Sequence, residues 1–172
     1  MSVIGTVKTL IIACGACELN RYVEFSGRIF IYSLPHTALQ EYDTLEKGRI
    51  QYYIESKECK QVVFVGPIEQ NLVDQLLQND LLQSIHAKLK FNLSVFLGDQ
   101  DKAVLSKSTR DQMLIELHVI SQCSLLMEYY FIRERVENGQ LRVQGIVTEM
   151  QDEQFKPIFN NGITYNDIIS MN

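Results

Sequence analysis

The two cysteines in the segment Cys14-Gly15-Ala16-Cys17 are the residues of this chain whose types and spacing most readily suggest chemistry. Two thiols separated by two residues can be oxidised to a disulfide and reduced again, and a helix beginning beside them would favour the reactive thiolate. Cys14 and Cys17 are therefore a candidate redox pair. Against this role, buried cysteine often serves as a small apolar residue, and Cys14 continues an apolar run. The pattern alone leaves both interpretations open.

A zinc site is the second chemistry that these thiols allow. Cys14 and Cys17 would supply two thiolate ligands, and His36 follows the next predicted strand, at the sheet edge where open α/β folds place their ligands. One cysteine pair with one distant histidine is a weaker zinc pattern than two paired half-sites at fixed spacing. His86 and His118 fall within helical patterns, so we expect surface side chains there or side chains bonded to a partner.

Short apolar runs predict the strands that must position these residues. The runs are continuous and rich in β-branched residues, which is typical of strands buried on both faces of a parallel sheet. The segment between the second and third runs has apolar residues at helical spacing, so a right-handed β-α-β crossover should join them. These strands are expected at Val7–Ala13, Phe30–Leu34 and Val62–Val65, with the helix within Leu39–Glu58.

The second half of the chain predicts further helices and a hairpin. Residues 71–89 are typical of one amphipathic helix or two short ones, and 91–97 alternates like a strand. A long helix within 108–136 should begin at Ser108 or Thr109 and stop at Asn138-Gly139, and 141–149 with 155–159 favours a hairpin. The order predicts an α/β fold with three layers. In it, helices flank a mostly parallel central sheet with a C-terminal hairpin or edge strand.

Composition limits the class of protein. The 172 residues are 46% hydrophobic, which suits one domain over 1–172. The net charge of -5 comes without a cluster of lysines and arginines, so we expect neither nucleic acid nor an anionic membrane as partner. The apolar run Thr9–Cys14 is too short to span a bilayer and lacks the features of a signal peptide. A cytoplasmic location with reduced thiols is the resulting expectation.

Two segments resemble the β-class carbonic anhydrases. The first is FIRERVENGQLRVQGIVTEM over 131–150, which is similar to a family pattern of a helix with a Val-Arg-Glu type core, a Gly-containing turn and a strand Leu-x-Val-x-Gly-x-Val. The second is TLIIACGACEL over 9–19, which resembles the segment with the family's first zinc cysteine, in the pattern Cys-x-Asp-x-Arg. The resemblance implies a β-carbonic anhydrase-like fold and a homodimer. It also implies an ancestral chemistry in which zinc-bound hydroxide attacks carbon dioxide.

Most of the zinc site implied by this resemblance is missing. Cys14 fits the first ligand position, but Ala16 and Glu18 replace the Asp and Arg that follow it. After the third strand, VVFVGPIEQ has Pro67 and Gln70 where the family has the His and Cys of Gly-His-x-x-Cys. Proline has no ligating side-chain atom, and an amide oxygen is a poor zinc ligand. We therefore expect a former active-site cleft without zinc or any other cofactor.

These observations favour a catalytically inactive or diverged β-carbonic anhydrase-like protein. It would serve as a binding or regulatory module for a small molecule or a protein. Two alternatives stay open at this point. One is a thiol oxidoreductase that uses Cys14 and Cys17, and the other is a metalloenzyme whose zinc is bound by Cys14, Cys17 and His36.

Overall fold

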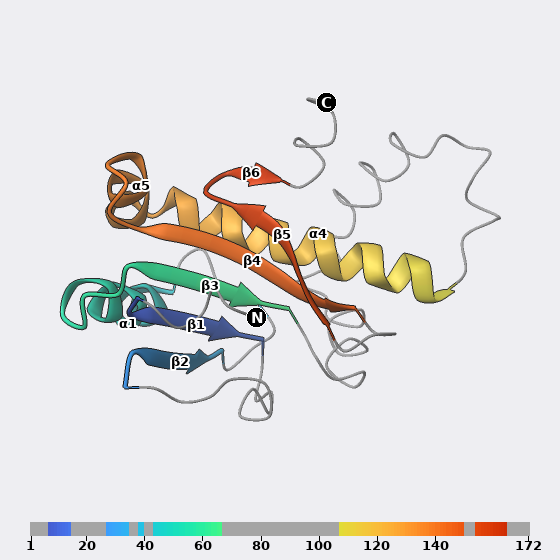
Figure 1. The fold of residues 1–172 in the computed structure, drawn as a ribbon, viewed down its shortest axis with the longest axis horizontal. Coiled ribbons are helices and arrows are strands. Elements are labelled where there is room, and N and C mark those ends of the chain that lie inside the picture. Colours follow the sequence, from blue (N-terminus) through green and yellow to red (C-terminus); the bar gives the residue numbers. More distant parts are fainter. Residues whose placement is uncertain are drawn as a thin grey trace.

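A computed structural model describes residues 7–14, 27–34, 38–39, 43–66, 107–149 and 154–164. These residues contain six strands and three helices (Figure 1). In chain order they are β1 (Thr9–Ala13), β2 (Ile29–Ser33), α1 (Thr44–Glu55), β3 (Gln61–Val65), α4 (Lys107–Glu128), α5 (Tyr130–Glu137), β4 (Arg142–Glu149), β5 (Gln154–Asn160) and β6 (Ile163–Thr164).

The strands form one sheet in the order β2-β1-β3-β4-β5-β6. The first four of these strands are parallel to one another, and β5 and β6 continue the sheet as antiparallel neighbours of β4 (Figure 1). The prediction of a mostly parallel sheet with a C-terminal hairpin is confirmed. Pro157, which has no N–H to donate, lies in β5 beside an irregularity in the pairing with β4, a place that tolerates proline.

Strands β1 and β3 are buried along their whole length, as their continuous apolar runs predict, whereas the edge strand β2 is partly exposed. One face packs against the helices in a single core cluster that includes Leu10 and Phe64 from the sheet, Ile50 from α1 and Val119 from α4. Figure 1 shows α4 running along this face behind β4. The alternate side chains of the same strands form a second buried cluster on the opposite face. No helix in the described part of the chain is both long and apolar enough to cross a membrane.

Helix α1 lies within the predicted segment Leu39–Glu58 and begins after Asp43. Its N-cap is Asp43, whose side-chain oxygen accepts hydrogen bonds from the backbone N–H groups of Leu45 and Glu46 at 2.9 and 3.0 Å. Leu39, the first residue of the predicted segment, lies outside the helix. Its backbone N–H donates instead to Oε1 of the buried Gln122 on α4, at 2.6 Å.

The long helix predicted over 108–136 is wrong as one continuous element. The helix breaks at Tyr129, whose backbone is extended and serves as the N-cap of α5. The Tyr129 ring is buried and stacks on Phe131 with 5.8 Å between the centroids. The predicted stop after Asn138 is confirmed, because Gly139 follows with a φ of +69° that glycine adopts readily.

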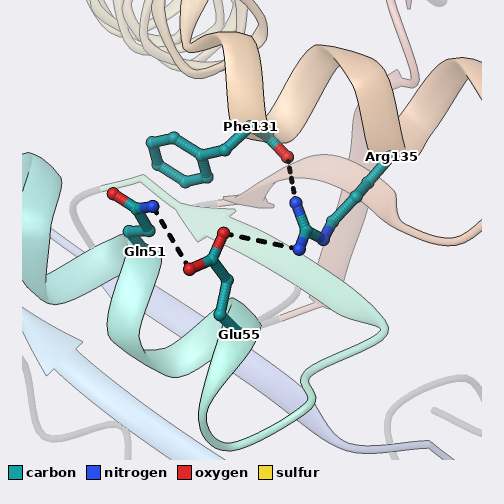
Figure 2. A network of polar contacts seen from close by, with 4 residues as sticks. All are labelled: Gln51, Glu55, Phe131 and Arg135. Atoms are coloured by element: carbon teal, nitrogen blue, oxygen red, sulfur yellow. Dashed lines mark hydrogen bonds and ion pairs between the residues drawn. The ribbon is translucent and has the colours of Figure 1, made fainter.

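A small polar network links α5 to α1 (Figure 2). Arg135 donates to the backbone oxygen of Phe131 at 3.1 Å and pairs with Glu55 at 3.4 Å, while Gln51 donates to the same carboxylate at 3.2 Å. These side chains are partly exposed, so the ion pair is expected to contribute less than about 1 kcal/mol. The buried cluster therefore dominates the packing of the helices.

Candidate functional site

Cys14 follows directly on β1, at the carboxyl ends of the parallel strands. Its backbone N–H donates to the backbone oxygen of Val65 on the neighbouring strand β3, at 3.4 Å. The side chain is 0% exposed and belongs to the core cluster beneath the helices. Cys14 therefore lies at the sheet edge where open α/β proteins place their ligands, with its thiol turned into the core.

Helix α4 brings a histidine to this thiol. The distance from Cys14 Sγ to His118 Nε2 is 3.7 Å, within the range of a hydrogen bond to sulfur, and His118 is 1% exposed. The tautomer of the ring decides which group donates. The ring of Phe64 on β3 meets the imidazole edge to face, with the centroids 6.2 Å apart. The result is a thiol–imidazole pair in an apolar, buried setting.

Two glycines allow α4 to come this close to the sheet. A Cβ atom on Gly66 would lie 2.9 Å from Val119, and one on Gly145 would lie 2.8 Å from both Val119 and Cys123. Val119 thus fills the space that the missing side chains leave above β3 and β4. His118 is the next residue along the helix, so this close packing also fixes its position against Cys14.

The sequence predicts that His118 lies either on the surface or in contact with a hydrogen-bonding partner. The structure confirms the second alternative, with Cys14 as the partner. The sequence contained a signal for its burial, since Ile115, Val119 and Cys123 recur at helical spacing on the buried face of α4. No pattern in the sequence linked this helix to Cys14.

The other predicted site residues lie outside the described part of the chain. This applies to the former cleft residues Ala16, Glu18, Pro67 and Gln70, and also to Cys17 and His36. The redox pair of Cys14 with Cys17 and the zinc site of Cys14, Cys17 and His36 therefore stay predictions.

The described residues do not fit a zinc ion. Cys14 and His118 would supply two ligands, whereas a catalytic zinc takes three protein ligands and a structural zinc takes four. Within the described ranges, no three His, Cys, Asp or Glu residues are grouped as metal ligands. The Cys14 and His118 contact is therefore best described as a hydrogen-bonded pair.

The other two described cysteines have different surroundings. Cys59 and Cys123 are free thiols and are buried, as Cys14 is. Burial raises the pKa of the Cys59 thiol to about 11 and that of the Cys123 thiol further still. His118, the histidine that the structure describes, contacts neither of them in a hydrogen bond. Cys14 thus differs from both in its imidazole neighbour.

A separate open groove of about 500 Å³ runs along α1. The guanidinium of Arg49 lies 5.9 Å from the centre of the Tyr32 ring. Burial raises the pKa of the Tyr32 phenol, and the nearby Arg49 acts in the opposite direction. Leu45 and Tyr52 line the same groove and are largely exposed. The remaining lining residues are Thr44, Gly48 and Tyr53. This surface combines apolar and aromatic groups with one cation.

Comparison with known proteins gives a consistent result. A family model described as carbonic anhydrase matches residues 24–155, which is more than half of the chain. No curated protein matches the chain in sequence.

Solved structures of β-carbonic anhydrases have a similar fold. The enzyme CafD of Aspergillus fumigatus superposes with a TM-score of 0.67 at 18% identity, over 92% of each chain. A tetrameric enzyme of Sordaria macrospora gives a TM-score of 0.63 at 17% identity, over 90% of this chain and 82% of that one. An enzyme of Coccomyxa, solved with acetazolamide, gives a TM-score of 0.67 at 16% identity, over 92% of this chain and 74% of that one. At these identities the similarity concerns the fold.

Proposed function

The chain belongs to the β-class carbonic anhydrase family, and from this membership we propose that it is a diverged member without zinc-hydroxide catalysis that works as a binding module. The family chemistry needs a zinc ion with an open position for water, which is the species that becomes hydroxide. In this proposal, the chain no longer assembles such a site and uses the family fold for binding.

The surroundings of Cys14 carry this proposal. Its thiol is closed off from solvent and faces His118 at 3.7 Å. The described residues around it supply two metal ligands and no third. The residue types at the other family positions support the same conclusion, because Pro67 and Gln70 are poor replacements for a histidine and a cysteine.

Metal analysis and a hydration assay test the proposal together. We expect protein purified without chelators to contain far less than one zinc per chain, and stopped-flow hydration of carbon dioxide to stay at the rate of the buffer. An active β-carbonic anhydrase, prepared in the same way, is the control for zinc loss during purification. One zinc per chain that disappears in Cys14→Ser, together with hydration above the buffer rate, would overturn the proposal.

We propose further that the binding module is a homodimer that meets its partner through α1 and β2. Strand β2 lies at one edge of the described sheet, and an edge strand has backbone groups that a second chain can pair with. Leu45 and Tyr52 on α1 expose large apolar side chains. The relative from Sordaria macrospora is described as tetrameric, which supports self-association. A single domain over 1–172, a cytoplasmic location and a further small-molecule or protein ligand stay predictions.

A further inference from the structure

We propose that the groove along α1 binds a flat aromatic carboxylate, with its ring over Gly48 and its carboxylate on Arg49. Such a ligand would be the small molecule of the binding module proposed above, so the assignment rests on that function. The groove is lined by α1 and by Tyr32 of the edge strand β2. Its volume of about 500 Å³ is in the range of pockets that bind small organic molecules.

Gly48 opens the middle of the groove. It lies inside α1, where glycine is less favourable for the helix than alanine. No atom lies within 4 Å of a Cβ added at this position, so packing within the chain does not require a glycine here. Leu45 and Tyr52 lie about one turn before and after it on the same side of the helix. The missing side chain therefore leaves a gap in which a flat ring can approach the helix backbone.

Tyr52 provides an aromatic surface beside this gap. Its side chain is 50% exposed, and Tyr53 meets its ring edge to face with 5.7 Å between the centroids. Tyr53 in turn contacts the ring of Phe30 on β2, also at 5.7 Å. The ammonium of Lys57 lies 5.6 Å from the centre of the Tyr52 ring and adds a positive charge nearby. An aromatic ligand can therefore contact Tyr52 in an offset or edge-to-face arrangement.

The charge of the groove favours an anion. Arg49 is exposed and is the charged residue among the described residues that line the groove. Its guanidinium has five N–H donors, and a carboxylate can accept two of them in parallel. Asp43 and Glu46 act on Tyr32 as negative charges without lining the groove. Asp43 accepts two backbone N–H groups at the start of α1, and Glu46 is 2% exposed.

A nuclear magnetic resonance titration of the full chain with three probes tests the ligand class. 2-Naphthoate has flat rings and a charge, 2-naphthamide has the same rings without the charge, and decahydronaphthalene-2-carboxylate has the charge on a saturated frame. We expect 2-naphthoate to shift the amide signals of Gly48, Arg49 and Tyr52. It should bind at least about threefold more tightly than either analogue, as expected for one exposed ion pair or one aromatic contact.

Two variants locate the site. Arg49→Gln should weaken binding of 2-naphthoate about threefold or more and leave 2-naphthamide unchanged, because only the anion uses the guanidinium. Gly48→Ala should weaken both naphthyl probes, because the added methyl group would lie where the ring is placed. The control is Arg142→Gln, at an exposed arginine of β4 outside the groove lining, which should bind as the parent does. Equal affinities for 2-naphthoate and 2-naphthamide, or the parent affinity in both groove variants, would contradict the assignment.

The groove site and the proposed function can fail separately. Leu45 and Tyr52 also belong to the face proposed for the dimer, so the titration uses a protein concentration at which sedimentation velocity finds monomer. No binding of 2-naphthoate under these conditions would refute the groove site and leave the loss of zinc catalysis untouched. One zinc per chain with hydration above the buffer rate would overturn the proposed function, and it would not alter the affinities measured in the groove.

Discussion

Cys14 and His118 are 104 residues apart in the sequence, and their meeting is the main result at the scale of single residues. Neither residue type is unusual by itself in a core. Together they place a nucleophilic sulfur and a base in contact inside an apolar cluster, where an interaction between polar groups is stronger than in water. Cys59 and Cys123 are buried as well, and burial raises the pKa of both thiols.

The raised pKa of Cys59 predicts a loss of stability at alkaline pH. The ordinary thiol pKa is 9.0 and the folded value is about 11, so between these values the unfolded chain gives up its proton first. The contribution of the thiol is therefore complete below pH 9 and declines as the pH rises towards 11. From pH 8 to pH 10.5 the loss should be about 2 kcal/mol.

Urea unfolding of the reduced protein at these two pH values measures this loss, with Cys59→Ala as the control. Other groups that titrate in this range affect both proteins equally, so the stability difference between them isolates the thiol. A difference that stays constant from pH 8 to pH 10.5 would show that Cys59 ionises normally in the folded chain.

At the scale of residues, one of the two residues of the described site, Cys14, could be predicted from the sequence. Cys14 could be identified because it ends an apolar run in a position that a known family uses. The contact of His118 with Cys14 could not be predicted. A helical pattern places a residue on one face of a helix but does not show which strand end that face covers. The packing of α4 on β3 and β4 decides this, and it depends on contacts between distant segments.

At the scale of elements, the close approach of α4 to the sheet depends on Gly66 and Gly145. We predict that Gly145→Ala destabilises the protein by about 1–3 kcal/mol, because the new methyl group would lie 2.8 Å from Val119 and Cys123 in a filled core. The control is Gly48→Ala in α1, where no atom lies within 4 Å of an added Cβ. That change should stabilise the helix by about 0.5–1 kcal/mol.

Urea unfolding of the two variants gives both free energies. Opposite signs are expected, since one alanine meets packed side chains and the other meets open space. If Gly145→Ala is neutral, α4 can move away from β4 without loss, and the contact of His118 with Cys14 does not depend on tight packing.

Strands and helices could be predicted from the sequence where a local pattern of apolar residues was enough to define their bounds. Strands β1 and β3 are continuous buried runs, and the ends of β1, β2 and β3 agree with the prediction within two residues. The break at Tyr129 was missed because 108–136 has good helical spacing throughout, and the contacts of the Tyr129 ring with Phe131 and with Lys47 on α1 cannot be read from that spacing. Helix α1 lies within its predicted segment, and the hydrogen bond from Leu39 to Gln122 on α4 joins residues too far apart in the sequence for a local pattern to predict.

At the scale of the whole molecule, the α1 and β2 side is the one that we expect a second copy to cover. Leu45→Glu should weaken dimerisation at least about tenfold, because it would place an unpaired carboxylate in an apolar interface, at a penalty above about 1.4 kcal/mol. Leu45 is 75% exposed, so the fold of the single chain should not change. Sedimentation velocity over a range of protein concentrations measures the effect.

The matched control is Ile163→Glu, which changes an exposed apolar residue on β6, at the opposite edge of the described sheet. It should leave dimerisation unchanged. Equal weakening by both variants would point to a general effect of charge, and a parent chain that sediments as a monomer at all concentrations would refute the dimer.

The fit of Val119 between two glycines has a consequence for engineering. Val119 packs helix α4 against the sheet. Its packing therefore also fixes the side chain at position 118 next to the sulfur of Cys14. Side chains of similar size could be exchanged there while the backbone stays in place. A carboxylate, an amide or a second thiol at position 118 would each form a different buried pair with Cys14. One substitution in α4 would then change the chemical character of the core without changing the fold.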